Sequence, residues 1–496
     1  MTCQCTWARP LSLCRFVDCK RLPISSSRTS LLKQQMKVAL VNPPWVFDHS
    51  VYRGCREAHL PLEFGYARQL LLQRRHDVLL CDAQLHGWDL RALVSEIAAY
   101  RPDVIVLTTA PSYLYWGCAP PELRVPLHTA RALRPFTERL IVIGPHASTT
   151  PRSTLCKLGA DVAILGECEE PLVRVVESDA RGYERLTSIA FFESGSEGPR
   201  AGPSAVRVQG LPAASDVRTL PALGWQRREL LEHRHHHSRF NREPDGFAAE
   251  LEASRGCPHS CSFCAKEHFR DRYRRRPLAI VLEEIDCLIH SGVRYLYFID
   301  EIFLPDEDLL HALEQRKIEF GVQLRIDNWS IPMLELLGSA GCVSVEAGVE
   351  SISTEGRSLL QKRARQSTAQ LTERLLVAKR NIAFVQVNLL DTGDAPDTLA
   401  AWRANLSQHG VWSMPPAPLF PYPGSAEYRR RCGVLDDHAW ERSHAHYLRE
   451  YVGWKQVQER SPLALPELEG IPLDSAPPPL DERGSVAERV RQDFLV

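Results

Sequence analysis

The fold of this chain is decided by the run Ser254-Arg255-Gly256-Cys257-Pro258-His259-Ser260-Cys261-Ser262-Phe263-Cys264. This run directly follows a short stretch, Ala249–Ala253, that we interpret as a buried β-strand. Gly256 and Pro258 allow the loop to turn sharply. Thiolates are soft ligands that suit iron–sulfur clusters, and tight spacing on one loop lets three of them converge on one centre. The sequence therefore predicts that Cys257, Cys261 and Cys264 bind a metal cluster.

The number of cysteines in this motif bears on its chemistry. A 4Fe–4S cluster held by four cysteines only transfers electrons, whereas three cysteines leave one iron open to a small molecule. The alternative is a zinc knuckle with His259 or His268 as the fourth ligand. Zinc sites usually come as two separated pairs of ligands, and no second pair lies nearby in the sequence. The spacing and the preceding strand favour the cluster.

Strand and helix patterns alternate around the motif, from residue 247 to about residue 423. Six such units are typical of an open, partial (β/α)6 barrel, whose chemistry lies at the carboxyl ends of the strands. The predicted strands are Ala249–Ala253, Tyr295–Ile299, Gln323–Ile326, Val343–Ala347, Phe384–Leu390 and Ala417–Phe420. The predicted helices are Pro277–Ser291, Asp306–Glu319, Ile331–Ser339, Ser353–Arg365, Leu371–Arg380 and Asp394–His409.

A second alternating series precedes the barrel, and its strands are continuous aliphatic runs of the kind found when both sheet faces are covered. It predicts a doubly wound, Rossmann-like parallel sheet, in which ligands bind outside the carboxyl ends of the strands. The predicted strands are Lys37–Asn42, Val78–Cys81, Val104–Thr108, Leu140–Ile143 and Asp161–Leu165, and the helices include Pro61–Arg74, Leu90–Tyr100 and Pro126–Leu133. A small hairpin is expected from Ile189–Phe192 and Ala205–Val208.

The chain is accordingly divided into five parts: an extension (1–35), the Rossmann-like domain (36–176), a connector (177–245), the barrel (246–425) and a helical carboxyl-terminal region (426–496) with a proline-rich mobile tail. The extension carries four cysteines and a basic excess. We interpret it as a translation start placed too early, with a targeting segment or a zinc site as alternatives. The run from His233 to His237 is expected to lie in a solvated loop, because consecutive side chains rarely converge on one ion.

Composition narrows the classes of function. The chain has 496 residues, 60 basic and 61 acidic, so its net charge of −1 gives no reason to expect nucleic acid as a partner. No apolar run approaches the roughly 20 residues that span a bilayer. Fifteen cysteines in a chain of this size indicate reduced thiols or metal ligands, and therefore the cytoplasm.

The motif Cys-x3-Cys-x2-Cys after the first strand of a partial barrel resembles the radical S-adenosylmethionine (radical SAM) superfamily. The resemblance implies a 4Fe–4S cluster that receives an electron from a flavodoxin- or ferredoxin-type donor and passes it to bound SAM. Cleavage of SAM then leaves a 5′-deoxyadenosyl radical that abstracts hydrogen from unactivated carbon.

Further segments of the barrel resemble the same family. The segments are Phe298-Ile299-Asp300-Glu301-Ile302-Phe303, Val345-Glu346-Ala347-Gly348-Val349-Glu350-Ser351 and the turn Phe420-Pro421-Tyr422-Pro423-Gly424-Ser425. The resemblance implies that Asp300, Glu301, Glu346 and Glu350 contact SAM, because carboxylates accept hydrogen bonds from an ammonium or a ribose hydroxyl. Each acidic residue, taken singly, is also compatible with a solvated strand end.

The first domain resembles the cobalamin-binding domain that precedes the barrel in one large (class B-like) radical SAM group. The matching stretches are Val41-Asn42-Pro43-Pro44, Leu60-Pro61-Leu62-Glu63-Phe64-Gly65-Tyr66-Ala67, Ile143-Gly144-Pro145-His146-Ala147-Ser148 and Gly166-Glu167-Cys168-Glu169-Glu170. The similarity is greatest to uncharacterised bacterial members from oligosaccharide or natural-product clusters. The residues that the resemblance assigns to cobalamin are Asp82, Gln84, Gly87, Thr108, Gly144, Pro145, His146, Gly166 and Glu167.

The first domain departs from its family at one position. Many cobalamin domains carry Asp-x-His-x-x-Gly, whose histidine ligates cobalt, but this chain has Asp82-Ala83-Gln84-Leu85-His86-Gly87. Glutamine cannot replace imidazole as a strong nitrogen ligand, and His86 lies two positions later. We therefore expect cobalamin bound without a histidine ligand, or a domain that has lost cobalamin.

The leading hypothesis is a cobalamin-dependent radical SAM enzyme that transfers a methyl group to carbon on a small molecule, glycan or natural product. The same cofactors also support cyclisation, oxidation or rearrangement. A methylthiotransferase with a second cluster at Cys55, Cys81 and Cys118 is an alternative, as is a non-enzymatic zinc or redox protein. The sequence assigns no catalytic side chain.

Overall fold

The computed structural model describes residues 35–45, 58–119, 123–193, 195–196, 198–233, 246–270 and 272–446. The predictions for the amino-terminal extension up to residue 34, for Cys55, for His235 to His237 and for the tail beyond residue 446 lie outside these residues.

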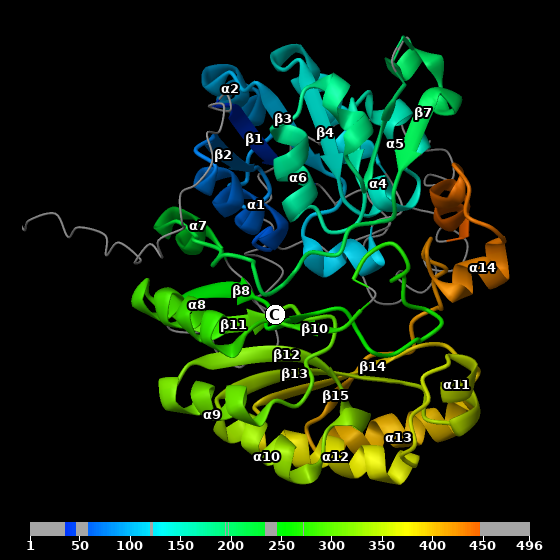
Figure 1. Ribbon diagram of the computed structural model, residues 1–496. Helices are drawn as coiled ribbons and strands as arrows, with labels where there is room; N and C mark the ends of the chain where they lie inside the picture. Colours follow the sequence, from blue (N-terminus) through cyan, green and yellow to red (C-terminus); the bar gives the residue numbers. More distant parts are fainter. Residues whose placement is uncertain are drawn as a thin grey trace, which may run out of the picture. The chain divides into compact units, whose positions relative to one another are not determined.

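The first sheet has seven strands in the order β2-β1-β3-β4-β5-β6-β7 (Figure 1). The first five are parallel, and the order reverses between β1 and β3 as in a doubly wound fold. The predicted hairpin pairs with itself and extends this sheet as two antiparallel edge strands. The strands are β1 (Lys37–Asn42), β2 (Asp77–Asp82), β3 (Val104–Thr108), β4 (Arg139–Ile143), β5 (Val162–Ile164), β6 (Ile189–Phe192) and β7 (Val206–Gln209).

Helices cover both faces of this sheet because alternate strand residues point to opposite sides. Side chains such as Val38 and Val106 pack against α1 and α6, whereas Ala39 and Leu107 pack against α2, α3 and α5. The helices are α1 (Leu62–Gln73), α2 (Leu90–Tyr100), α3 (Arg124–Leu133), α4 (Pro145–Thr149), α5 (Pro151–Leu158) and α6 (Glu169–Val176), and α7 (Arg227–Glu232) follows in the connector.

The second large sheet has six parallel strands in sequential order, β15-β14-β13-β12-β11-β8, as a partial barrel requires. The strands are β8 (Phe247–Leu251), β11 (Val293–Phe298), β12 (Glu319–Arg325), β13 (Cys342–Glu350), β14 (Phe384–Leu389) and β15 (Trp412–Ser413). Figure 1 shows the outer helices beside them, which are α8 (Leu278–His290), α9 (Glu307–Arg316), α10 (Ile331–Ser339), α11 (Thr354–Leu359), α12 (Thr368–Asn381) and α13 (Pro396–Gln408), with α14 (Ala426–Cys432) following.

Several sequence predictions are wrong in detail. The strand expected at Gln323–Ile326 is β12, which begins at Glu319, and the helix expected at Ser353–Arg365 is α11, which ends at Leu359. The sixth barrel strand was expected at Ala417–Phe420 but is β15, and Ala417 keeps a single bridge to Leu390. Pro418, like Pro415 and Pro416 just before this stretch, lacks the amide hydrogen that a strand ladder needs. His233 was expected in a solvated loop but is buried, with its Nδ1 2.9 Å from the carbonyl oxygen of Ala248.

Two short strands close the loop that carries the cysteines. β9 (Ser254–Arg255) and β10 (Arg274–Arg275) pair antiparallel, so the chain leaves the barrel after β8 and returns beside its own exit. The loop is thereby fixed at both ends next to the carboxyl end of β8.

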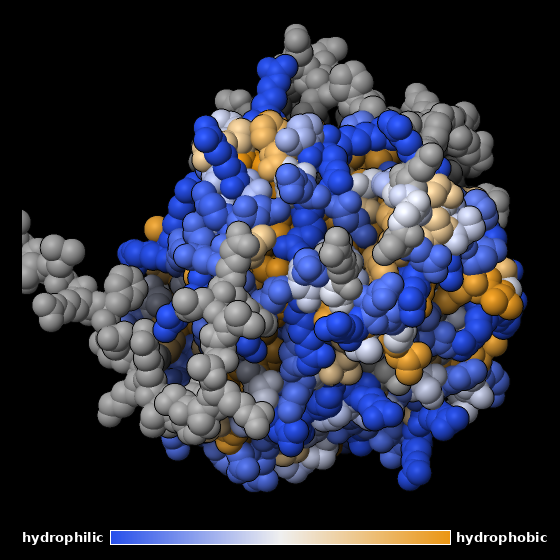
Figure 2. All heavy atoms as spheres, turned by 45° about the horizontal axis from the view of Figure 1, so that its top comes forward, coloured by the Kyte–Doolittle hydropathy of each residue, from blue (hydrophilic) through white to orange (hydrophobic). Residues whose placement is uncertain are grey.

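The face of the molecule drawn in Figure 2 is mainly polar. Figure 2 shows hydrophilic residues over most of the face in view, with apolar residues scattered among them. No helix within the described residues is both long enough and apolar enough to cross a membrane.

We expect Gly166→Ala to destabilise the protein because Gly166 has a φ of +79° and an added Cβ would lie 2.4 Å from the carbonyl oxygen of Ala213. Left-handed backbone costs an alanine about 1–2 kcal/mol, and the collision adds about 1–3 kcal/mol. Gly393→Ala is the matched control, since Gly393 has a φ of +78° and open space around it. Denaturant unfolding should show a clearly larger loss for Gly166→Ala, and equal losses would contradict this packing.

Candidate functional site

The three predicted cluster ligands lie together on the loop between β9 and β10. Cys261 is buried, Cys257 is half-buried and Cys264 is exposed. Burial raises the pKa of Cys257 and Cys261, and the charge of Cys257 adds to this rise for Cys261. The thiols are therefore close enough to interact, although the described residues contain no group of three ligand side chains already arranged around a metal position.

The backbone of this loop is held by two hydrogen bonds from a lysine and by close packing at a glycine. Lys266 donates from Nζ to the carbonyl oxygens of Cys257 (2.8 Å) and His259 (2.7 Å). Gly256 has a φ of +76°, and a Cβ there would lie 2.1 Å from the carbonyl oxygen of Arg272. Two features therefore require glycine at position 256. The backbone is left-handed, and the main chain of Arg272 lies too close for a side chain.

Two cations from the barrel reach the cysteine loop. Arg325, the last residue of β12, donates from Nη1 to Cys261 Sγ at 3.4 Å and is fixed by Asp327. Burial raises the pKa of Cys261, while Arg325 and Lys362 oppose this rise. Both cations can offset the negative charge that three thiolates bring to the site. Sequence reasoning missed them, although a basic residue at the end of a barrel strand was a usable signal for Arg325.

Asp300 and Glu301 hold the stretch of chain that precedes the first cysteine. Asp300 accepts hydrogen bonds from the Ala253 amide (3.0 Å) and the Ser254 hydroxyl, and burial raises its pKa to about 7. Glu301 accepts from the Gly256 amide at 2.7 Å, and desolvation raises its pKa. The two carboxylates therefore position the backbone that leads into Cys257.

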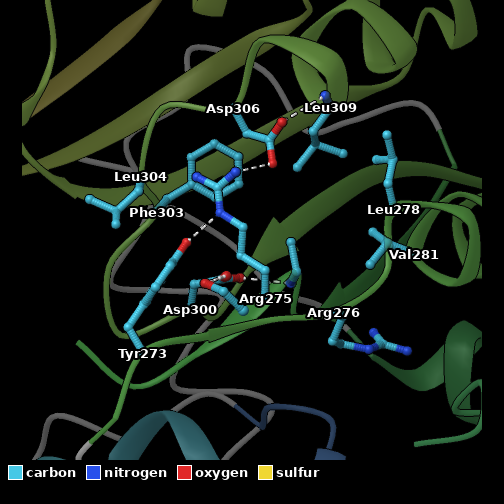
Figure 3. Close-up of a pocket in the computed structure, with 12 residues that line it drawn as sticks. Tyr273, Arg275, Arg276, Leu278, Val281, Asp300, Phe303, Leu304, Asp306 and Leu309 are labelled. Atoms are coloured by element: carbon cyan, nitrogen blue, oxygen red, sulfur yellow. Dashed lines mark hydrogen bonds and ion pairs between the residues drawn. The ribbon is translucent and has the colours of Figure 1, made fainter. Parts of the chain in front are cut away.

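Asp300 also lines a pocket outside the cysteine loop (Figure 3). Figure 3 shows Arg275 crossing this pocket, with bonds to the Tyr273 hydroxyl (2.9 Å) and to Asp306 (2.6 Å). Leu278 and Phe303 belong to its apolar wall. Arg275 thus links β10 to Asp306, the residue that precedes α9.

The two glutamates of β13 occupy different surroundings. Glu350 has a φ of +62° and forms an ion pair with Lys362, which also donates to the Gly348 carbonyl oxygen at 3.0 Å. Glu346 lies in register with Gln323 of β12 and Gln386 of β14. The structure therefore brings Glu350 to the cations beside Cys261 and places Glu346 in a polar row across the sheet.

The residues assigned to cobalamin lie at the carboxyl edge of the first sheet. Asp82 accepts from the Asn42 side chain (2.8 Å) and the Leu85 amide (3.0 Å), and burial raises its pKa to about 7. Gln84 and Gly87 occupy the turn that follows β2. Thr108 donates to the Ala110 carbonyl oxygen at 2.7 Å.

The loop after β4 is equally tight. Gly144 has a φ of +118°, and a Cβ there would lie 2.4 Å from the Thr109 hydroxyl oxygen. Pro145 begins α4, and the His146 ring is buried with its centroid 4.1 Å from that of Trp440. His86 contacts Glu232 of α7.

A buried network of charges joins the first domain to the cysteine loop, and sequence reasoning missed it. Arg255 is fully buried and bridges Glu167 (2.9 Å), Glu169 (2.7 Å) and Glu252 (2.6 Å). Arg270 binds Glu252 (2.8 Å) and Glu301 (2.5 Å). The contacts run without interruption from the loop after β5 to the Gly256 amide.

This network settles where Glu167 lies. One carboxylate oxygen is 2.9 Å from Arg255 Nη1 and accepts from the Ser215 amide at 3.0 Å, and the other binds Arg274. The arginines hold the pKa of Glu167 below its ordinary value against the opposing effect of burial. Glu167, which the sequence assigned to cobalamin, faces the barrel and is saturated by protein contacts.

The comparisons with known proteins agree with this architecture. Residues 251–390 match the radical SAM superfamily. The chain is 22% identical over 334 residues to an uncharacterised methyltransferase of Pyrococcus horikoshii, covering 64% of this chain and 66% of that one. It is 26% identical over 373 residues to the hopanoid C-3 methylase of Methylococcus capsulatus, covering 72% and 65%. The chain therefore matches just under two thirds of the length of each relative.

A solved structure shares both domains. The radical SAM methyltransferase TsrM of Kitasatospora setae, with cobalamin and a [4Fe–4S] cluster bound, superimposes with a TM-score of 0.57. The match covers 79% of this chain and 74% of that one at 19% identity. The likeness therefore concerns the fold, a Rossmann-like domain followed by a radical SAM barrel.

We expect Arg255→Met to lower the free energy of unfolding by about 3–5 kcal/mol, because it removes the cation shared by three buried carboxylates. Arg218→Met is the control, since Arg218 forms an exposed pair with Asp216 and its loss should leave stability nearly unchanged. Denaturant unfolding measures both. If Arg255→Met and the wild type had the same free energy of unfolding, the network would not be what holds the first domain to the barrel.

Proposed function

Residues 251–390 are a radical SAM domain, and from this premise we propose that the protein is a cobalamin-dependent radical SAM enzyme that methylates an unactivated carbon. The observation that carries the proposal is the loop of Cys257, Cys261 and Cys264 at the carboxyl end of the first barrel strand. Three soft ligands on one loop fit a 4Fe–4S cluster with one open iron. When bound, the cluster supplies one electron for cleavage of SAM, and cobalamin supplies the methyl group.

The residues of the chain have separable roles in this proposal. Asp300 and Glu301 position the backbone before Cys257, so that the loop is preorganised for the cluster. Arg325 and Lys362 stabilise negative charge at Cys261. Glu350, held by Lys362, is the carboxylate that we assign to the polar groups of SAM. Glu346, in register with Gln323 and Gln386, is likewise assigned to SAM.

The carboxyl edge of the first sheet fits cobalamin without a histidine ligand. Gln84 stands at the family's histidine position, and His86 is bound to Glu232. Gly144 lets its backbone pack against Thr109, which fixes the loop after β4 at this edge. A methyl-transferring cobalt works with a weak or absent lower ligand.

The proposed chemistry also indicates the electron donor, the cellular compartment and the class of substrate. A reduced cluster needs a one-electron donor of the flavodoxin or ferredoxin type, and we place the protein in the cytoplasm because its cysteines must stay reduced. The substrate is a small molecule, glycan or natural product. The methylases among its relatives support carbon as the acceptor.

Anaerobic reconstitution should give about four iron atoms per chain, whereas a methylthiotransferase with two clusters would hold about eight. Cys257→Ala, Cys261→Ala and Cys264→Ala should each abolish most of the bound cluster and lower 5′-deoxyadenosine formation at least about 100-fold, because each removes one of three ligands. Metal analysis and mass spectrometry provide the readouts.

The control for these variants is Cys287→Ala, an exposed cysteine on α8 outside the loop, which should keep wild-type iron. Methylation should also release S-adenosylhomocysteine together with 5′-deoxyadenosine. Zinc in place of iron, or iron that persists in all three loop variants, would refute the proposal.

A further inference from the structure

An arginine of the barrel donates a hydrogen bond to one of the predicted cluster ligands. Arg325 is the last residue of β12, and its Nη1 lies 3.4 Å from Cys261 Sγ. Arg325 is 8% exposed and Cys261 is 9% exposed, so water competes little for this contact. A positive charge and a negative charge interact more strongly in such a poorly hydrated place than at the surface.

The guanidinium of Arg325 is held in this position by three further hydrogen bonds. Its Nε and Nη2 donate to the two carboxylate oxygens of Asp327 at 3.1 Å and 2.7 Å, and Nη2 also donates to the Lys362 carbonyl oxygen at 2.7 Å. The backbone carbonyl oxygen of Asp327 accepts in turn from Arg374 at 2.9 Å. A planar guanidinium bound at so many atoms cannot turn away without breaking several hydrogen bonds. Its N–H group is therefore preorganised toward Cys261 Sγ.

A hydrogen bond to a ligand sulfur changes how readily an iron–sulfur cluster is reduced. Reduction adds one electron, and with it one negative charge, to the cluster and its thiolates. Hydrogen bonds to the sulfurs, nearby charges and exclusion of water all change the free energy of that added charge, and through it the reduction potential. The N–H group and positive charge of Arg325 stabilise the reduced cluster more than the oxidised one. The carboxylate of Asp327 acts in the opposite direction, because its negative charge repels the added electron.

We propose that Arg325 raises the reduction potential of the cluster through its hydrogen bond to Cys261, and that Asp327 limits this rise. The inference rests on the proposed function, because it requires that the three cysteines of the loop hold the cluster. It adds that the third barrel strand adjusts how easily a donor of the flavodoxin or ferredoxin class reduces the cluster. One electron passes from the reduced donor to the oxidised cluster, and neither a proton nor a covalent bond changes place.

The test is an anaerobic redox titration of the reconstituted full chain without SAM, in which electron paramagnetic resonance measures the reduced cluster. Arg325→Gln removes the charge and should lower the ratio of reduced to oxidised cluster at a fixed potential about 10-fold, which is about 59 mV for one electron. Asp327→Asn removes the opposing charge and should raise the same ratio about 3- to 10-fold. Arg325→Lys keeps the charge but not the guanidinium fork, and its ratio should lie between those of Arg325→Gln and the wild type.

Two comparisons isolate the redox role. Arg316→Gln is the matched control and should keep the wild-type ratio, because Arg316 pairs with Asp286 on the outer helices. The variants are compared at equal iron content and with matching circular dichroism spectra, so that loss of cluster or of fold is not mistaken for a change in potential. A residue that served only to bind SAM would not change a potential measured without SAM.

The outcomes distinguish a failure of this inference from a failure of the proposed function. If the wild type holds no iron–sulfur cluster, the proposed function itself fails. If the cluster is present and Arg325→Gln and Asp327→Asn leave its potential unchanged, or shift it in the same direction, the redox role of Arg325 is refuted while the proposed function stands. Shifts of opposite sign, with the wild-type potential in Arg316→Gln, support the inference. If Arg325→Gln cannot hold the cluster, a lower potential in Arg325→Lys and a higher one in Asp327→Asn are required instead, and any other result refutes it.

Discussion

The structure depends on the buried ion network centred on Arg255. Taking charges out of water is costly, and a buried ion pair is often no more stabilising than apolar residues of the same size. The main effect of such a network is therefore to fix the positions of the groups that it joins, and its net contribution to stability is smaller. Arg255 binds Glu167 of the first domain and lies two residues before Cys257. The residue that anchors the first domain thus lies next to the loop that carries the cysteines.

The same network explains how two separate sheets present their carboxyl edges to one site. Parallel strands place ligand-binding loops at one edge of each sheet. Glu301, which follows the second barrel strand, binds both Arg270 and the Gly256 amide. This strand is therefore also held against the cysteine loop. Because Tyr113 of the first domain packs against Phe269 (5.2 Å), an aromatic contact accompanies the charged one. The site is consequently built from both domains, in agreement with the two-domain fold shared with TsrM.

The sequence was sufficient for the parallel strands and for the cysteine motif, and insufficient for most partners of the site residues. Continuous aliphatic runs such as Val104–Thr108 identified strands because both faces of each sheet are covered. β15 was misplaced because it is only two residues long and is followed by prolines. Glu167 and Arg255 are 88 positions apart, and no local pattern connects them. Their pairing, and with it the orientation of Glu167 toward the barrel, emerges only from the packing of the two domains.

The central claim is that three thiolates hold a cluster whose remaining iron is free to bind SAM. Mössbauer spectroscopy of protein reconstituted with 57Fe, recorded with and without SAM, tests this most directly. The account predicts that SAM alters the signal of one iron site and leaves the others unchanged, because only that iron lacks a cysteine ligand. Spectra that are identical with and without SAM, or that show no iron–sulfur cluster, would contradict it.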